Sequence, residues 1–169
     1  MNIRPAQPKD IPGIFNLVAE HAERGDVLLR SKAQIGATIS EWMVGTDENK
    51  IVACGSLLDY TPELAEVRSL IVADSIKGQG WGAALLQVLI ARARRRGTPI
   101  LFALTRAEPF FRRAGFTPSD RARFPEKIWR DCDQCPVKDN CDEVAVELRL
   151  SELPHLSQSP ITDVQLGSA

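Results

Sequence analysis

The stretch Lys77-Gly78-Gln79-Gly80-Trp81-Gly82 places three glycines directly ahead of an apolar helical pattern over residues 83–96. Glycines at this spacing let successive backbone N–H groups face one point without obstruction from Cβ atoms, and a helix N-terminus adds the positive end of its dipole. The apolar content of residues 65–73 predicts a strand just before the loop. Together they predict a phosphate-binding turn; the alternative is a tight turn that needs glycine for its backbone conformation alone.

Two common phosphate loops do not fit these residues. A nucleoside triphosphate loop needs Gly-Lys-Ser or Gly-Lys-Thr at the helix start, where this chain has Gly80-Trp81-Gly82. A dinucleotide-binding fingerprint is formally present in Gly78, Gly80 and Ala83, but residues 74–77 separate its first glycine from the strand, where that motif has no spacer. The antiparallel strands expected upstream also argue against it.

The rest of the chain predicts an α/β fold, with helices flanking a mixed, mostly antiparallel sheet. Upstream of the loop we expect an edge strand, two helices and a hairpin, at residues 3–6, 8–22, 31–42 and 42–58. The second helix begins with a capping-box pattern, Ser31 to Gln34. Downstream we expect a strand, a brief helix and a last strand, at residues 100–104, 108–113 and 144–150.

Length and charge limit the domain organisation and the partners. The 169 residues fit one domain over 1–150, which includes a polar, cysteine-bearing loop at 119–142, and residues 151–169 predict a mobile tail. Lys and Arg total 21 against 22 for Asp and Glu, so we expect no nucleic-acid partner. No apolar run approaches the roughly 20 residues of a bilayer span, and the first ten residues do not resemble a signal peptide. These features predict a cytoplasmic protein with no membrane partner.

Three of the four cysteines crowd into one loop as Cys132, Cys135 and Cys141, while Cys54 stands apart in an expected strand. In a cytoplasmic chain such cysteines are thiols or metal ligands before they are disulfides. Zinc favours four ligands, and the pattern supplies three. We therefore expect no metal, with these three thiols as weak zinc candidates.

The loop and its surroundings resemble the GNAT superfamily of N-acetyltransferases. The signature of that superfamily is Arg or Gln, two residues, Gly, one residue, then Gly or Ala, and Lys77, Gly80 and Gly82 match it with Lys in the first position. The segment from Phe110 to Phe116 is similar to the superfamily's second cofactor-side motif. The resemblance covers most of residues 1–150.

This resemblance implies the GNAT fold and acetyl-CoA as cosubstrate. The pyrophosphate would lie on the backbone amides from Gln79 to Ala83, and the pantetheine along the strand. The implied cofactor-binding residues are Leu70, Ile71, Val72, Lys77, Gly78, Gln79, Gly80, Trp81, Gly82 and Ala83. Many members have a Tyr at the position of Phe111 that protonates the leaving thiolate, so this chain needs another acid.

Three further stretches resemble the amino-acid N-acetyltransferases that make N-acetylglutamate, at residues 27–31, 65–70 and 101–105. Residues 124–132 are similar to the short stand-alone members. The resemblance implies acetylation of the α-amino group of glutamate, an early step toward arginine. Alternatives are another amine substrate, or a non-catalytic acetyl-CoA sensor. Both a monomer and a homodimer stay open.

Glu66 and Thr105 are the expected catalytic residues. Acetyl transfer to an amine needs a base to remove a proton and an acid to protonate the thiolate. Glu66 lies on the strand that leads into the cofactor loop, and the resemblance implies that it acts as the base through a bound water. The resemblance places the acid at Thr105. If they are not catalytic, Glu66 is an exposed carboxylate on a strand, and Thr105 is a hydroxyl that forms a local hydrogen bond.

An acidic amino acid brings two carboxylates, for which arginine offers planar bidentate donors. Arg30, just before the second helix, is the first choice for the substrate side chain, and its alternative is an exposed residue at the start of that helix. Arg68 and Lys127 are weaker choices, and the alternation of a strand puts Arg68 on the face of Glu66. The backbone N–H of Ser69 is the expected donor to the α-carboxylate.

Overall fold

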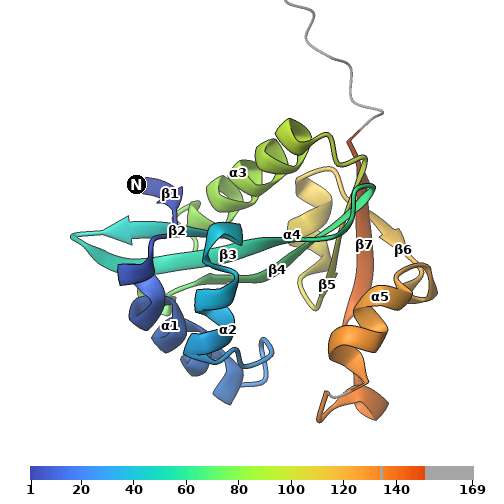
Figure 1. The fold of residues 1–169 in the computed structure, drawn as a ribbon, viewed down its shortest axis with the longest axis horizontal. Helices are drawn as coiled ribbons and strands as arrows, with labels where there is room; N and C mark the ends of the chain where they lie inside the picture. Colours follow the sequence, from blue (N-terminus) through green and yellow to red (C-terminus); the bar gives the residue numbers. More distant parts are fainter. Residues whose placement is uncertain (134, 151–169) are drawn as a thin grey trace, which may run out of the picture.

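The computed structural model describes residues 1–133 and 135–150. A seven-stranded sheet in the order β1-β2-β3-β4-β5-β7-β6 runs through this part of the chain (Figure 1). Its strands are β1 (Asn2–Pro5), β2 (Trp42–Asp47), β3 (Lys50–Thr61), β4 (Leu64–Val72), β5 (Ile100–Thr105), β6 (Thr117–Ser119) and β7 (Val144–Arg149). Only β4 and β5 are parallel neighbours, so the predicted mixed, mostly antiparallel sheet is confirmed. The predicted mobile tail, residues 151–169, lies outside the described residues.

The α-helices are α1 (Ile11–Glu23), α2 (Lys32–Ala37), α3 (Trp81–Arg96), α4 (Glu108–Arg113) and the single turn α5 (Pro125–Lys127), which continues into a π-helical turn (Ile128–Cys132). Short 3₁₀ turns lie at Pro8–Asp10, Ile39–Glu41, Asp74–Ile76, Arg121–Arg123 and Lys138–Asn140. The expected capping box starts α2: Ser31 Oγ accepts from the Gln34 N–H at 3.2 Å, and the Ser31 N–H donates to the Gln34 side chain at 2.8 Å.

Helices cover both faces of the sheet, with α1 and α2 on one side and α3 on the other (Figure 1). Because successive side chains of a strand point to opposite faces of the sheet, each face receives its own set of apolar residues. Met43 and Ala53 pack with α3, whereas their neighbours Val44 and Cys54 pack with α1. The α5 turn lies over the α1 face beyond β4, because Phe124 stacks on Phe102 of β5 with ring centroids 4.1 Å apart.

The sheet opens between β4 and β5. These strands pair only over three residues each, Leu64 to Glu66 with Ile100 to Phe102, and β5 then continues beside β7 alone. Just beyond the opening, β4 carries a bulge in which Ser69 has a φ of 51° and the register with β3 shifts. A bulge bends its strand and leaves the extra residue without a ladder partner. The opening therefore places irregular backbone of β4 beside a gap in the sheet.

The structure departs from the sequence expectations in several places. The second helix, expected over 31–42, ends at Ala37, and the short strand β6 was not expected. The hairpin strands are longer than expected, reaching Asp47 and Thr61. Helix α3 begins at Trp81 and so includes Gly82, which the sequence assigned to the loop. The segment 119–142 is not simply a polar loop: it contains α5, and Phe124, only 2% exposed, anchors it to the sheet. Fully burying a Phe side chain stabilises a fold by roughly 1.5–3 kcal/mol, so Phe124 anchors the start of this segment to the sheet.

Candidate active site

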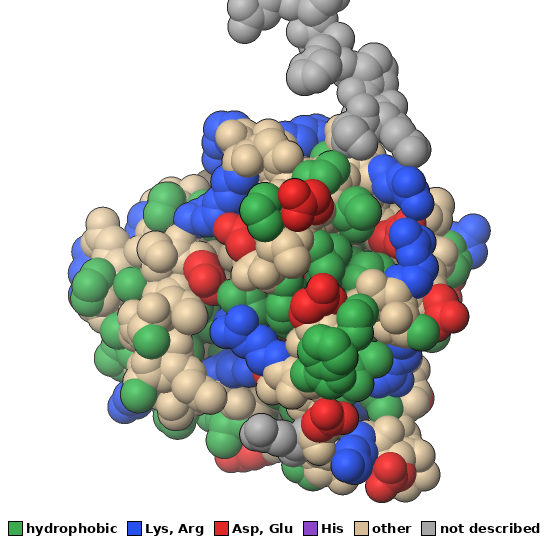
Figure 2. Space-filling view, turned by 45° about the vertical axis from the view of Figure 1, so that its right-hand side comes forward, with side chains coloured by type: hydrophobic (Ala, Val, Ile, Leu, Met, Phe, Trp, Pro, Cys, Tyr) green, Lys and Arg blue, Asp and Glu red, His purple; other side chains and the backbone are tan. Residues whose placement is uncertain are grey.

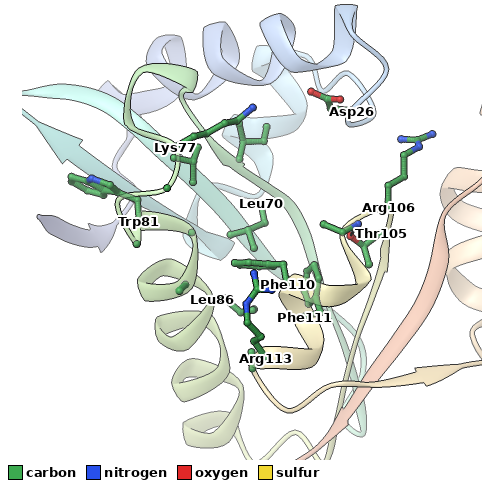
Figure 3. Close-up of a pocket in the computed structure, with 18 of the residues that line it drawn as sticks. Asp26, Leu70, Lys77, Trp81, Leu86, Thr105, Arg106, Phe110, Phe111 and Arg113 are labelled. Atoms are coloured by element: carbon green, nitrogen blue, oxygen red, sulfur yellow. Dashed lines mark hydrogen bonds between the residues drawn. The ribbon is translucent and has the colours of Figure 1, made fainter.

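A cavity of about 690 Å³ lies along the glycine loop and the start of α3 (Figure 3). The predicted cofactor residues Leu70, Ile71, Val72, Lys77, Gly78, Gly80, Trp81, Gly82 and Ala83 all line it. Gln79 does not line the cavity, and its N–H donates to the Ile76 carbonyl at 3.3 Å, so the structure does not place this predicted residue at the cavity wall. Phe110, Phe111 and Arg113 of α4 form another wall, and all three belong to the segment that resembles the second cofactor-side motif.

The N-terminus of α3 presents free amides to this cavity. Gly80 has a φ of 86°, a left-handed conformation that glycine adopts without strain, and its carbonyl accepts from the Ala84 N–H at 3.0 Å. The N–H groups of Trp81, Gly82 and Ala83 therefore precede the first helical hydrogen bond and have no partner within the helix. An anion such as a pyrophosphate suits this end of the helix.

The Trp81 side chain fixes the start of α3 by packing on the side of the helix that faces away from the cavity. Its indole is buried in the α3 core and points away from the cavity (Figure 3). Gly45 of β2 makes room for the ring, since a Cβ there would lie 2.9 Å from it. Trp81 therefore contributes its backbone N–H group to the cavity, and not its side chain.

Two cations at the cavity differ in their availability. Lys77, at the first position of the signature, pairs with Asp74, which also pairs with Arg24. Hydrogen bonds from Lys77 and Arg24 lower the pKa of Asp74 to about 2. Arg113 forms no ion pair within the described part of the chain and lines the cavity from α4. Its position inside the second cofactor-side motif was the signal that could have identified it.

Glu66 lies on the α1 face of the sheet, on the side away from α3. Its neighbours Ala65 and Val67 belong to the α3 core, so Glu66 points the other way. It is 2% exposed, its Oε2 accepts from the Tyr60 hydroxyl at 2.8 Å, and its Oε1 lies 2.8 Å from the Lys127 ammonium. The expected alternative, an exposed strand carboxylate, is wrong.

Lys127 and Arg30 complete a buried network of charges with Glu66. The Lys127 ammonium also lies 2.7 Å from Asp131, and both Nη atoms of Arg30 donate to the two Asp131 oxygens at 3.0 Å. Burial alone would lower the pKa of Lys127, but the Glu66 and Asp131 carboxylates outweigh it and raise that pKa. Burial would raise the pKa of Asp131, but hydrogen bonds from Arg30 and the charge of Lys127 hold it well below its usual range.

The structure thus groups Arg30 and Lys127, two of the predicted substrate-binding residues, with Glu66, but with their charges paired inside the protein. The Arg30 side chain is 12% exposed, so it is not the exposed helix-start residue of the alternative reading. Its Nε is buried without a hydrogen-bond partner among the described residues. The guanidinium therefore retains one donor that the protein does not use.

Arg68 joins this group from β4, two residues after Glu66. Its Nε donates to Ser56 Oγ at 3.3 Å, and an Nη lies 3.8 Å from Glu41. Burial and repulsion from Arg30 lower the pKa of Arg68. The bulge residue Ser69 follows, so the backbone expected to bind an α-carboxylate lies at the gap in the sheet.

Thr105 ends β5 and lines the cavity on the face opposite to Glu66. Leu101 and Ala103, four and two residues earlier, belong to the α3 core, so alternation puts Thr105 on that face. Its Oγ1 accepts from the Ala107 N–H at 2.9 Å and donates to no acceptor within the described residues. Phe111 has no hydroxyl to offer and is held edge-on between Phe110 and Phe116.

Sequence reasoning missed the carboxylates and the phenol that surround these residues: Glu41, Tyr60 and Asp131. The spacing of Lys127 and Asp131, four residues apart, puts both on one side of a helical turn and could have predicted their pairing. Tyr60 and Glu41 gave no comparable signal, because only the folded hairpin brings them near β4.

The cysteines do not gather into a metal site. Within residues 1–133 and 135–150, no group of three or more His, Cys, Asp or Glu side chains is arranged to hold a metal ion. Cys54 is buried in β3, and burial raises its pKa to about 12. Cys132 lies 4.0 Å from an Arg121 nitrogen. No helix in the described part of the chain is long and apolar enough to cross a membrane.

Two curated proteins are similar in sequence to this chain. An uncharacterised N-acetyltransferase of Chlorobaculum tepidum is 33% identical over 144 residues, which are 85% of this chain and 93% of that protein. An amino-acid acetyltransferase of Pseudomonas putida (strain GB-1) is 33% identical over 125 residues, 73% of this chain and 29% of that protein. The chain thus spans less than a third of the length of the amino-acid acetyltransferase it matches.

A solved structure agrees with both the fold and the cavity. N-acetylglutamate synthase from Neisseria gonorrhoeae, complexed with coenzyme A and N-acetyl-glutamate, superposes with a TM-score of 0.78 and 27% identity, over 88% of this chain and 35% of that one. The amides at the start of α3 in this chain fit the pyrophosphate of such a coenzyme. Residues 14–116 match the family described as the acetyltransferase (GNAT) family, so this chain belongs to that family.

Proposed function

We propose that this protein transfers the acetyl group of acetyl-CoA to the α-amino group of L-glutamate, the first step of arginine biosynthesis, in the cytoplasm. One observation carries the proposal: the buried Glu66 is surrounded by three cationic side chains, Arg30, Arg68 and Lys127, on the face of the sheet opposite to α3. A substrate with two carboxylates suits a buried site rich in such groups. The N-acetyl-glutamate complex of the Neisseria gonorrhoeae enzyme supports the same choice.

The two expected catalytic residues lie on opposite faces of the sheet opening. Glu66 pairs in register with Phe102 and Thr105 lies three residues further along β5, about 10 Å at the rise of a strand. Glu66 takes the amine proton through a water on the acceptor side, and Thr105 donates a proton to the departing thiolate on the cofactor side. This division lets the amine and the thioester approach the opening from opposite sides.

The cations and the bulge would orient the acceptor. Arg30 would bind the side-chain carboxylate, the Ser69 backbone N–H the α-carboxylate, and Arg68 would supply positive charge between them. Lys127 and Tyr60 hold the two oxygens of Glu66 in fixed positions. Fixed geometry of this kind lowers the barrier by placing reacting groups before the reaction begins.

A panel of amines tests the proposal through thiol release from acetyl-CoA. Glutamate should give the highest kcat/KM, above glutamine, aspartate, lysine and a peptide with a free N-terminus. Substituting Glu66→Gln should reduce kcat by about 100-fold or more, the range of general base catalysis, while acetyl-CoA binding stays unchanged. The matched control is Glu63→Gln, an exposed carboxylate near the start of β4. Preferred turnover of a different amine would contradict the glutamate assignment, and no turnover at all would favour an acetyl-CoA sensor.

A further inference from the structure

The α5 segment, residues 125–132, occupies both ends of the acceptor site. Its Lys127 places an ammonium 2.8 Å from Glu66, and its Asp131 places a carboxylate on both Nη atoms of Arg30 at 3.0 Å. An amino-acid acceptor also presents an ammonium and a carboxylate. If Glu66 is the base and Arg30 the carboxylate-binding group, the segment fills the site with the same two charges that a substrate brings.

We propose that Asp131 is a specificity-determining residue that competes with the acceptor's side-chain carboxylate for Arg30. The inference rests on the proposed function, because it uses the acceptor side assigned there. The acceptor carboxylate binds Arg30 by displacing Asp131, and the α5 segment shifts away from the site when it does so. Asp131 thereby sets how strongly the site binds an acidic acceptor.

Three observations support competition. Asp131 satisfies only the Nη atoms of Arg30, and the Arg30 Nε is buried with no partner among the described residues, so a second carboxylate has a donor waiting. The cations Arg30, Arg68 and Lys127 already face three acids, Glu66, Glu41 and Asp131, so an added carboxylate must compete with an acid that is already in place.

The third observation is the backbone that carries Asp131. Residues 128–132 form a π-helical turn, a rare conformation that is frequent at functional sites. Exposed Trp129 lies within this turn, so its outer face is not fixed by packing. Phe124, by contrast, is buried against Phe102 and holds the start of the segment. The segment is thus anchored at one end and carries the competing carboxylate at the other.

The substitution Asp131→Asn tests the competition, because competition and positioning predict opposite changes in KM for glutamate. The amide keeps the shape of the side chain and one acceptor oxygen but removes the charge. Competition predicts that KM for glutamate falls about tenfold, while KM for glutamine and for acetyl-CoA changes by less than twofold. If Asp131 instead positions Arg30 for the substrate, KM for glutamate rises. The matched control, Asp133→Asn, changes an exposed carboxylate two residues along and should leave all three constants unchanged.

Hydrogen–deuterium exchange of the wild-type protein supplies a second measurement, which does not depend on how the variant folds. With coenzyme A present, saturating glutamate should speed the exchange of amides in residues 125–132 several-fold, because Asp131 leaves Arg30. Slower or unchanged exchange overturns the competition.

The two proposals fail in different ways. If the wild-type protein acetylates glutamate but Asp131→Asn raises or preserves its KM, the competition is wrong and the proposed function stands. If the amine panel selects an acceptor other than glutamate, the proposed function is wrong. If that acceptor carries a side-chain carboxylate, as aspartate does, faster exchange in residues 125–132 still supports the competition and slower or unchanged exchange overturns it. Selection of an acceptor without such a carboxylate overturns the competition as well.

Discussion

At the scale of single residues, we propose that the hydroxyl of Thr105 takes the role that a tyrosine has in many relatives of this fold. Thr105 lines the cavity, accepts a hydrogen bond from the Ala107 N–H, and has its own proton free among the described residues. Phe111 occupies the neighbouring wall without any polar atom. The proposed source of the proton for the thiolate is therefore Thr105, or a water that it binds.

Thr105→Val should reduce kcat by about 100-fold, because general acid catalysis by a positioned group contributes about that much or more. Thr105→Ser keeps the hydroxyl and should retain most of the rate. Steady-state rates with saturating acetyl-CoA and glutamate check this result. Equal turnover of the valine variant and the parent would show that another donor protonates the thiolate.

Asp131 also makes stability depend on pH. Its pKa in the folded protein lies below the value of about 3.9 expected in the unfolded chain, so the unfolded state binds the proton first as the solution is acidified. The stabilising effect is complete above about pH 4 and is lost as the pH falls through the folded-state pKa, by about 1.4 kcal/mol for each unit of pKa difference.

Thermal unfolding between about pH 6 and pH 2 tests this linkage. The wild-type melting temperature should fall more steeply below pH 4 than that of Asp131→Asn, which has no carboxyl group to titrate at this position. Parallel curves for the two proteins would mean that Asp131 has the same pKa in the folded and unfolded states.

At the scale of elements, the glycine loop was predictable and α5 was not. Gly78, Gly80 and Gly82 carry a local signal, since a left-handed conformation and a close approach to an anion both need residues without Cβ atoms. The site contacts of α5 depend on pairings such as Lys127 with Glu66 and Asp131 with Arg30, which join residues 61 and 101 positions apart. No periodicity within residues 119–142 encodes such contacts, so a polar loop was the natural expectation.

Gly82→Val should weaken coenzyme A binding at least tenfold in calorimetric titration. A Cβ at Gly82 meets Phe110 and Val72 only at ordinary contact distances of 3.5 Å, so the fold tolerates a side chain there. The added methyl groups would instead fill the space in front of the α3 amides. Arg95→Val, on an exposed position of the same helix, controls for the lower helix propensity of valine. Unchanged affinity in a folded Gly82→Val protein would reject the loop as the phosphate site.

At the scale of the whole molecule, the opening between β4 and β5 organises the site. The strand pattern predicted the segments that form the sheet except the short β6, but the point at which β4 and β5 part depends on the bulge at Ser69 and on β5 pairing with β7. The distribution of charged side chains over the surface is also a property of the whole molecule. Lys and Arg side chains are interspersed with Asp and Glu over the face in view in Figure 2, with no patch of one sign that would suit a polyanion.

Coenzyme A contacts residues from β4, α3 and α4 if it fills the cavity, so its binding should stabilise the whole fold. A ligand at 100 times its dissociation constant adds about 2.7 kcal/mol to the free energy of unfolding, which for a domain of this size raises the melting temperature by roughly 5–10 °C. Differential scanning fluorimetry with increasing coenzyme A measures this shift. Glu66→Gln should show the full shift, because Glu66 faces the acceptor side, whereas Gly82→Val should show little. A shift lost equally in both variants would mean that the two faces of the opening do not separate cofactor binding from acceptor chemistry.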